Sequence, residues 1–261
     1  MIDQLHALNA LDLNADTETD NLVRLALLNH LGIVFAGRRA LACQSLEREL
    51  AGLESGLFAF PGGQRLSFLA AIAVGEAAAS SVTFTKADAP VATSATTPSA
   101  APSKLLAALL PLALARDVTL GSLTSSFLAG LIVLDAGLRE GAAAAASAAW
   151  LEGATPVETA ALALTCAQTT SVLGGLLRAT ARARDVQADA RDAVTKAVQW
   201  QMPKNLRLDA QQAPEEVAAR FMQRAVPDVK AEQALVFATN LLSCERAAPW
   251  RMLWDALVSV D

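Results

Sequence analysis

Apolar residues recur along most of this chain at spacings of three and four, and this periodicity predicts helices. The first run, residues 21–35, is apolar on nearly every side, so it predicts a buried helix that ends at Gly37. Further helices are predicted over residues 40–53, 68–79, 104–115 and 120–138, separated by glycine, proline and polar residues. Between the helices predicted over residues 40–53 and 68–79, Phe58 and Phe60 are interpreted as an apolar plug rather than a strand. The pattern therefore indicates a bundle with several fully covered helices.

The second half continues in the same way. Thr155, Pro156 and Glu158 occupy the N-cap, first and third positions of a capping box, which predicts a helix over residues 156–173. The pair Gly174-Gly175 interrupts this helix. The charges of both signs along residues 177–200 are typical of a solvated helix face. Three more helices are predicted over residues 214–226, 230–244 and 249–257. The last carries tryptophans on one face, which is typical of core or dimer-interface anchors.

Composition supports an all-α fold and one domain. Hydrophobic residues make up 53% of the 261 residues, aromatics only 5%, and there is no Tyr, whereas strands favour aromatic and β-branched residues. We expect a single helical domain over residues 1–261: a main core over 1–200, a connector over 201–213 and C-terminal helices over 214–261.

Charge and cysteine content narrow the class of function. A net charge of −5 argues against nucleic acid as a partner. The apolar runs fall short of the roughly 20 residues that a membrane span needs, and no signal peptide is apparent, so a cytoplasmic protein is expected. Cys43, Cys166 and Cys244 are odd in number and far apart, which indicates buried thiols rather than a disulfide framework or a metal site. No metal and no cofactor are expected.

Residues 80–104, called the polar stretch below, form the longest polar, helix-poor interval. We expect a loop across the end of the bundle, where helical enzymes tend to place their chemistry. Its lysines, Lys86 and Lys104, either hold a carboxylate or lie on a solvated surface. Both histidines, His6 and His30, are interpreted as structural.

Several segments resemble the MmgE/PrpD family, which includes 2-methylcitrate dehydratase and cis-aconitate decarboxylase. Residues 27–37, Leu-Leu-Asn-His-Leu-Gly-Ile-Val-Phe-Ala-Gly, resemble the signature of its first helix. Residues 69–78, Leu-Ala-Ala-Ile-Ala-Val-Gly-Glu-Ala-Ala, are similar to the Ala-rich helix before its active-site loop. Residues 98–137, 165–177 and 220–257 resemble later helices. The resemblance implies the family's helical domain and lyase chemistry on a small di- or tricarboxylate.

The departures from the family pattern fall in the polar stretch. The family has a histidine where Ser80 stands, acids in the places of Thr83, Thr85 and Lys86, and the histidine of a His-Pro pair where Thr97 stands. These five residues therefore form a degenerate site if the resemblance is correct.

Two further departures follow. The family's later segment with Lys and His has only Arg178, Arg182 and Arg184 as loose counterparts. The family also inserts an α+β lid before its C-terminal helices, and the connector over residues 201–213 is too short to hold one.

Three hypotheses about function result. The first is a catalytically impaired, pseudoenzyme-like subunit that forms a homodimer, or a heteromer with a full-length family member, and binds a small carboxylate through Lys86, Lys104 and the three arginines. The second is an active lyase or isomerase, a dehydratase or decarboxylase, in which a buried lysine of lowered pKa serves as base. The third is an unrelated all-α interaction module.

Overall fold

The computed structural model describes residues 17–53, 56, 58–60, 63–83, 85, 91–93, 101–182 and 208–258. Helices account for most of these residues, and their strands form two short two-stranded sheets. The all-α fold expected from composition and periodicity is therefore confirmed.

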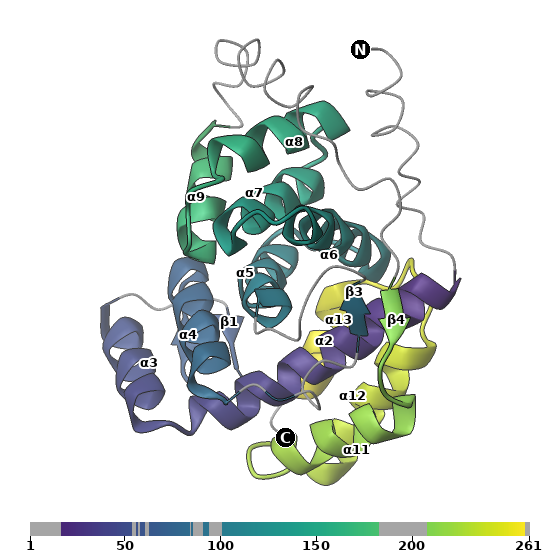
Figure 1. The fold of residues 1–261 in the computed structure, drawn as a ribbon. Coiled ribbons are helices and arrows are strands. Elements are labelled where there is room, and N and C mark those ends of the chain that lie inside the picture. Colours follow the sequence, from purple (N-terminus) through teal and green to yellow (C-terminus); the bar gives the residue numbers. More distant parts are fainter. Residues whose placement is uncertain are drawn as a thin grey trace.

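The helices follow one another as α2 (Thr17–Arg38), α3 (Leu41–Leu53), α4 (Phe68–Ser81), α5 (Ala101–Ala115), α6 (Leu120–Asp135), α7 (Glu140–Leu151), α8 (Pro156–Thr165), α9 (Val172–Arg182), α11 (Pro214–Ala225), α12 (Ala231–Ser243) and α13 (Trp250–Val258). The strands are β1 (Phe58–Ala59), β2 (Arg65–Leu66), β3 (Val91–Thr93) and β4 (Leu208–Ala210). In Figure 1, α2 crosses the lower part of the molecule beside α11 and α12, and α5 to α9 fill the upper part.

Helix α2 is the long buried helix that the first apolar run predicted. It packs against α4, α5, α11 and α12, and its side chains from Leu27 to Phe35 are almost all buried. The helix continues past Gly37 to Arg38, so the predicted end is wrong by one residue. Gly37 is needed inside the helix because a Cβ there would lie 1.9 Å from the carbonyl oxygen of Ala78 in α4. Among the described helices, none combines the length and apolar character needed to cross a membrane.

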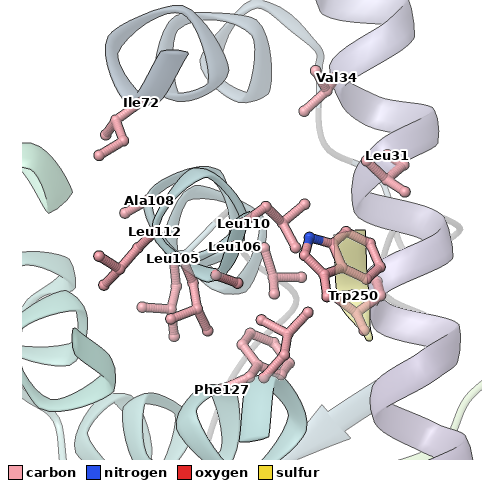
Figure 2. Packing of buried hydrophobic residues seen from close by; sticks show 14 of the residues in the cluster. Leu31, Val34, Ile72, Leu105, Leu106, Ala108, Leu110, Leu112, Phe127 and Trp250 are labelled. Carbon is pink, nitrogen blue, oxygen red and sulfur yellow. The ribbon is translucent and has the colours of Figure 1, made fainter. Parts of the chain in front are cut away.

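The core forms around α5, whose leucines project toward several neighbouring helices (Figure 2). Leu106 and Leu110 lie near Trp250 of α13 and Leu31 of α2, and Phe127 of α6 lies below them. Trp250 and Trp254 are both buried, so the last helix contributes its tryptophans to the core of this chain. The interpretation of these tryptophans as core residues is confirmed.

The Ala-rich helix α7 allows unusually close packing of α6 and α9. A Cβ at Gly175 of α9 would lie 1.8 Å from the carbonyl oxygen of Gly141, and one at Gly130 of α6 would lie 2.3 Å from Oγ of Ser147. Small side chains therefore let these helices approach at backbone distance, which fixes the start of α9 against the start of α7.

Both sheets are short antiparallel ribbons. β1 pairs with β2, and Phe58 and Phe60 are buried against Trp254, so this segment plugs the core and also forms a strand. The expectation of a plug without a strand was wrong, because residues 65–66 supply a pairing partner. β3 pairs with β4 in the register Val91↔Ala210, which joins the polar stretch to the connector beside α2.

The capping box of α8 is confirmed, but the helix is shorter than predicted. The N–H of Thr155 donates to the Glu158 carboxylate at 2.8 Å, and this bond lowers the pKa of that carboxyl. α8 ends at Thr165, whose hydroxyl donates to the carbonyl of Leu162. α9 then begins at Val172, so the two glycines expected to break a helix lie inside its first turn.

Candidate functional site

The described part of the polar stretch keeps its hydroxyls close to its own helix. Ser80 and Ser81 donate to the carbonyls of Glu76 and Ala77, each at 2.8 Å, and both side chains are exposed. Thr83 and Thr85 are also exposed. Lys86 and Thr97 lie outside the described residues. The structure therefore shows two of the expected site positions as exposed threonines and one, Ser80, as a hydroxyl bonded to its own helix end.

Lys104, the last residue of the polar stretch, lies in the helix that was predicted to begin with it, but this helix starts three residues earlier than predicted. α5 begins at Ala101, so Lys104 stands in the first turn of this helix, where the partial charge of the helix is positive. Its Nζ lies 3.8 Å from Oε1 of Glu140, and both side chains are 28% exposed. The start of the helix was missed because polar and small residues alternate before Lys104, which is typical of a loop. Within this segment, however, Ala101 and Pro102 are favourable residues for the first turn of a helix.

Three helix N-termini meet beside α4. Glu140 opens α7, the N–H of Gly141 donates to the carbonyl of Thr169 at 3.1 Å, and α9 starts shortly after Thr169. Ser171 donates its hydroxyl to the Glu76 carboxylate at 3.4 Å, and it also caps α9 by accepting from the N–H of Gly174.

We call Glu76, Lys104, Glu140 and Ser171 the helix junction. α4, α5, α7 and α9 each supply one of these residues or the residue before its first turn. Sequence reasoning identified only Lys104 among them. Glu76 could have been noticed as the one charged residue of α4, and Ser171 as the hydroxyl three residues before a helix glycine.

His30 lies close to the junction but is held as a structural group. Its Nδ1 is 2.8 Å from Oγ of Ser103, the residue before Lys104, and both side chains are buried. Burial lowers the pKa of His30 to about 3, so the ring is neutral at physiological pH. The structural interpretation of His30 is confirmed, and His6 lies outside the described residues.

Two of the three predicted arginines belong to the described part of α9. Arg178 and Arg182 belong to α9, and their backbone positions lie about 9 and about 15 Å along the helix axis from Val172. Arg184 lies outside the described residues.

The cysteines are free thiols. Cys43 and Cys166 are buried and Cys244 is partly buried. Burial is the main cause of the raised pKa of Cys43 and of Cys244, so both are protonated at neutral pH. Within the described residues, no group of three or more His, Cys, Asp or Glu side chains is placed to hold a metal ion.

A second charged group, which the sequence analysis did not single out, joins the start of α2 to the turn after α12. Asp20 accepts from Nε of Arg24 at 2.7 Å and from Nη1 of Arg246 at 3.0 Å. Arg24 also donates to the carbonyls of Leu241 and Cys244 at the end of α12. We call Asp20, Arg24 and Arg246 the Asp20 cluster.

The Asp20 cluster lines a cavity of about 510 Å³ between the start of α2 and the turn after α12. The buried pair of Asp20 and Arg24 is bonded to itself and to the carbonyl end of α12, so the cluster holds α2 against α12 as a tether. The spacing of Asp20 and Arg24, four residues apart on a helix, is the signal that predicts the pair.

Comparison with known proteins leaves the family open. A scan against protein-family models matched no family, and a search of curated proteins found no matching relative. The resemblance to the MmgE/PrpD family therefore stays a prediction from the motifs quoted above.

Proposed function

We propose that this chain is a non-catalytic helical protein, similar to the helical domain of the MmgE/PrpD family, that binds a small di- or tricarboxylate at the helix junction. The observation that carries the proposal is the position of Lys104, a half-buried cation in the first turn of α5. A cation there opposes the partial positive charge of its own helix end. A residue that breaks a local rule in this way is a candidate for function.

The loose pairing of Lys104 supports the same interpretation. A distance of 3.8 Å between Nζ and the Glu140 carboxylate exceeds the length of a hydrogen bond, so the pair leaves Lys104 able to donate to a ligand oxygen. The starts of α7 and α9 add partial positive charge nearby. Their N–H groups at Gly141 and Gly174 already have acceptors, so we assign the direct bond to Lys104 and a longer-range attraction to the helix ends.

The lack of turnover is proposed from what the nearby groups do. His30 is neutral and bonded to Ser103, and Ser80 donates to its own helix. Neither is arranged to move a proton to or from a ligand. The degenerate positions in the sequence, Thr83, Thr85 and Thr97 in place of acids and a histidine, support the same proposal.

A second candidate, an active lyase or isomerase, has one observation in its favour. Glu76 lies at the junction and accepts only a long hydrogen bond, 3.4 Å, from Ser171. A carboxylate bound this weakly has the chemistry of a general base, and α4, which carries it, packs against α5, which carries Lys104. This candidate predicts turnover that depends on Glu76 and on Lys86 or Lys104.

Calorimetric titration with citrate, 2-methylcitrate and cis-aconitate tests binding. We expect at least one of these to bind the full-length chain, and Lys104→Ala to weaken its binding about 10-fold or more, because a charge-assisted hydrogen bond is lost. Lys230→Ala removes an exposed lysine at the start of α12 and is the matched control. Binding that is equally strong in Lys104→Ala, or no binding of any of the three acids, would contradict the proposal.

A turnover assay on the same three acids separates the two candidates. The proposal predicts that substrate concentrations stay constant with the wild-type protein. Turnover that disappears in Glu76→Gln or Lys86→Ala, but persists in Lys230→Ala, would replace the proposed function with the lyase.

A further inference from the structure

A buried polar pair joins α2 to the first turn of α5. Nδ1 of His30 lies 2.8 Å from Oγ of Ser103, the third residue of α5, and the two residues are 2% and 5% exposed. A hydroxyl can donate to a neutral ring nitrogen or accept from it, so this bond forms with either tautomer of the ring. Nearby, the same two helices present apolar side chains to the core, such as Leu31 and Leu106 (Figure 2).

The polar pair supplies direction rather than stability. Burying a hydroxyl and an imidazole costs them their bonds to water, so the bond between His30 and Ser103 adds little to the net free energy of folding. An apolar contact tolerates small shifts and rotations, whereas a hydrogen bond holds two atoms within a narrow range of distance and angle. Single polar residues in apolar helix contacts fix the register of the helices in this way. The pair therefore fixes how the first turn of α5 is rotated against α2.

This turn also carries Lys104, the next residue after Ser103. Successive residues of an α-helix are about 100° apart around its axis, so a buried Ser103 turns its neighbour toward the partly exposed side, where Lys104 is 28% exposed. The ion pair with Glu140 is 3.8 Å long, too long for a hydrogen bond, and does not hold Lys104 in one direction.

We propose that His30 is a positioning residue of the helix junction, which fixes the first turn of α5 through Ser103 and so sets the place from which Lys104 reaches a carboxylate. His30 acts through Ser103 and does not contact the ligand. The inference rests on the proposed function for the ligand, whereas the order of the turn is measurable without one.

Variants of the pair separate positioning from stability in the full-length chain. His30→Leu and Ser103→Ala each leave a buried partner without its bond, and each should lower the urea midpoint of unfolding by about 0.5 to 1 M. The double variant His30→Leu/Ser103→Ala replaces both polar groups by apolar ones of similar size, so its midpoint should return close to that of wild type. Its Kd for citrate should nevertheless stay about 5-fold or more above wild type, because the cation is no longer pre-organised.

The conservative variant His30→Asn should show the opposite behaviour. The Asn amide reaches about as far as Nδ1 and can bond to Ser103, but the shorter side chain leaves a cavity. We expect a lower urea midpoint and a citrate Kd within about 2-fold of wild type. A wild-type Kd in the double variant, or a Kd in His30→Asn as weak as in the double variant, would make the pair merely structural and overturn the proposal.

Amide hydrogen exchange reports on the same turn without ligand. In an α-helix the N–H groups of residues 105–107 bond to the carbonyls of residues 101–103, so their protection measures the order of the first turn. In the double variant this protection should fall about 10-fold or more, while that of the α7 amides stays as in wild type. If wild type binds none of the three acids, the proposed function fails, but a selective loss of protection still supports ordering of the turn by His30. Unchanged protection would overturn the inference even if citrate binds.

Discussion

The Asp20 cluster and the helix junction both bring together charged residues from distant parts of the sequence, but they hold their charges differently. In the Asp20 cluster, Arg24 and Asp20 are 5% exposed and their closest atoms are 2.6 Å apart. At the junction, Lys104 and Glu140 are partly exposed and 3.8 Å apart. A buried group must satisfy its hydrogen bonds within the fold, whereas a partly exposed one can exchange its partner for water or a ligand. The comparison identifies the first group as a tether and the second as a candidate binding site.

Removing the central arginine of the Asp20 cluster should have the largest effect. Arg24→Ala leaves Asp20 buried with one cation and leaves the carbonyls of Leu241 and Cys244 without their donor, which should cost about 3 to 5 kcal/mol of unfolding free energy. Urea denaturation measures this change. Arg246→Ala removes the 34% exposed partner and is the matched comparison, with an expected cost of about 1 kcal/mol. Equal losses from the two variants would show that burial does not distinguish the two arginines.

The buried histidine next to the junction should make stability depend on pH. The folded-state pKa of His30, about 3, lies below the usual 6.5, so at intermediate pH the unfolded chain binds a proton that the folded chain does not. Stability from this residue is fully present above about pH 6.5 and is lost as pH falls toward 3. Between pH 7 and 4.5 the loss should be about 2 to 3 kcal/mol.

The variant His30→Gln isolates this contribution. Carboxylates elsewhere titrate in both proteins, so the difference between the two pH profiles of unfolding free energy belongs to His30. Identical profiles for wild type and His30→Gln would show that folding does not change the pKa of this histidine, which contradicts its burial.

Periodicity was sufficient for most of the helices, because a run that is apolar on every side, such as that of α2, is stable only when it is buried. The helix α7 was not predicted, since its run of alanines shows no contrast between apolar and polar positions. Boundaries failed where a tertiary contact overrides local preference. Gly37 and Gly175 are helix breakers by propensity, yet both lie inside helices because neighbouring backbones pack against them. The strand at Phe58 was missed because it is only two residues long, and so short a segment shows no alternation of apolar and polar residues. Its pairing partner, β2, lies beyond a turn.

The candidate site was predictable only in part. Lys104 was identified as a charged residue in a polar stretch, but its partner Glu140 is 36 residues away and lies between two predicted helices, at the start of α7. Glu76 and Ser171, which are 95 residues apart, are brought together by the packing of α4 and α9. Side chains that are brought together by tertiary packing have no regular spacing in the sequence, so they cannot be predicted from it. Asp20 and Arg24, by contrast, are four residues apart on one helix, and this spacing predicts their contact.

The smallest change should come from the residue proposed to bind ligand. Without ligand, Lys104→Ala should alter the unfolding free energy by less than about 0.5 kcal/mol, because the ion pair is long and the cation opposes its own helix end. With citrate at about 100 times its Kd, the wild type should gain about 2.7 kcal/mol and the variant much less. Urea denaturation with and without citrate at constant ionic strength measures both quantities. A loss from Lys104→Ala as large as that from Arg24→Ala, and independent of citrate, would make Lys104 a tether like Arg24 and remove the distinction between the two clusters.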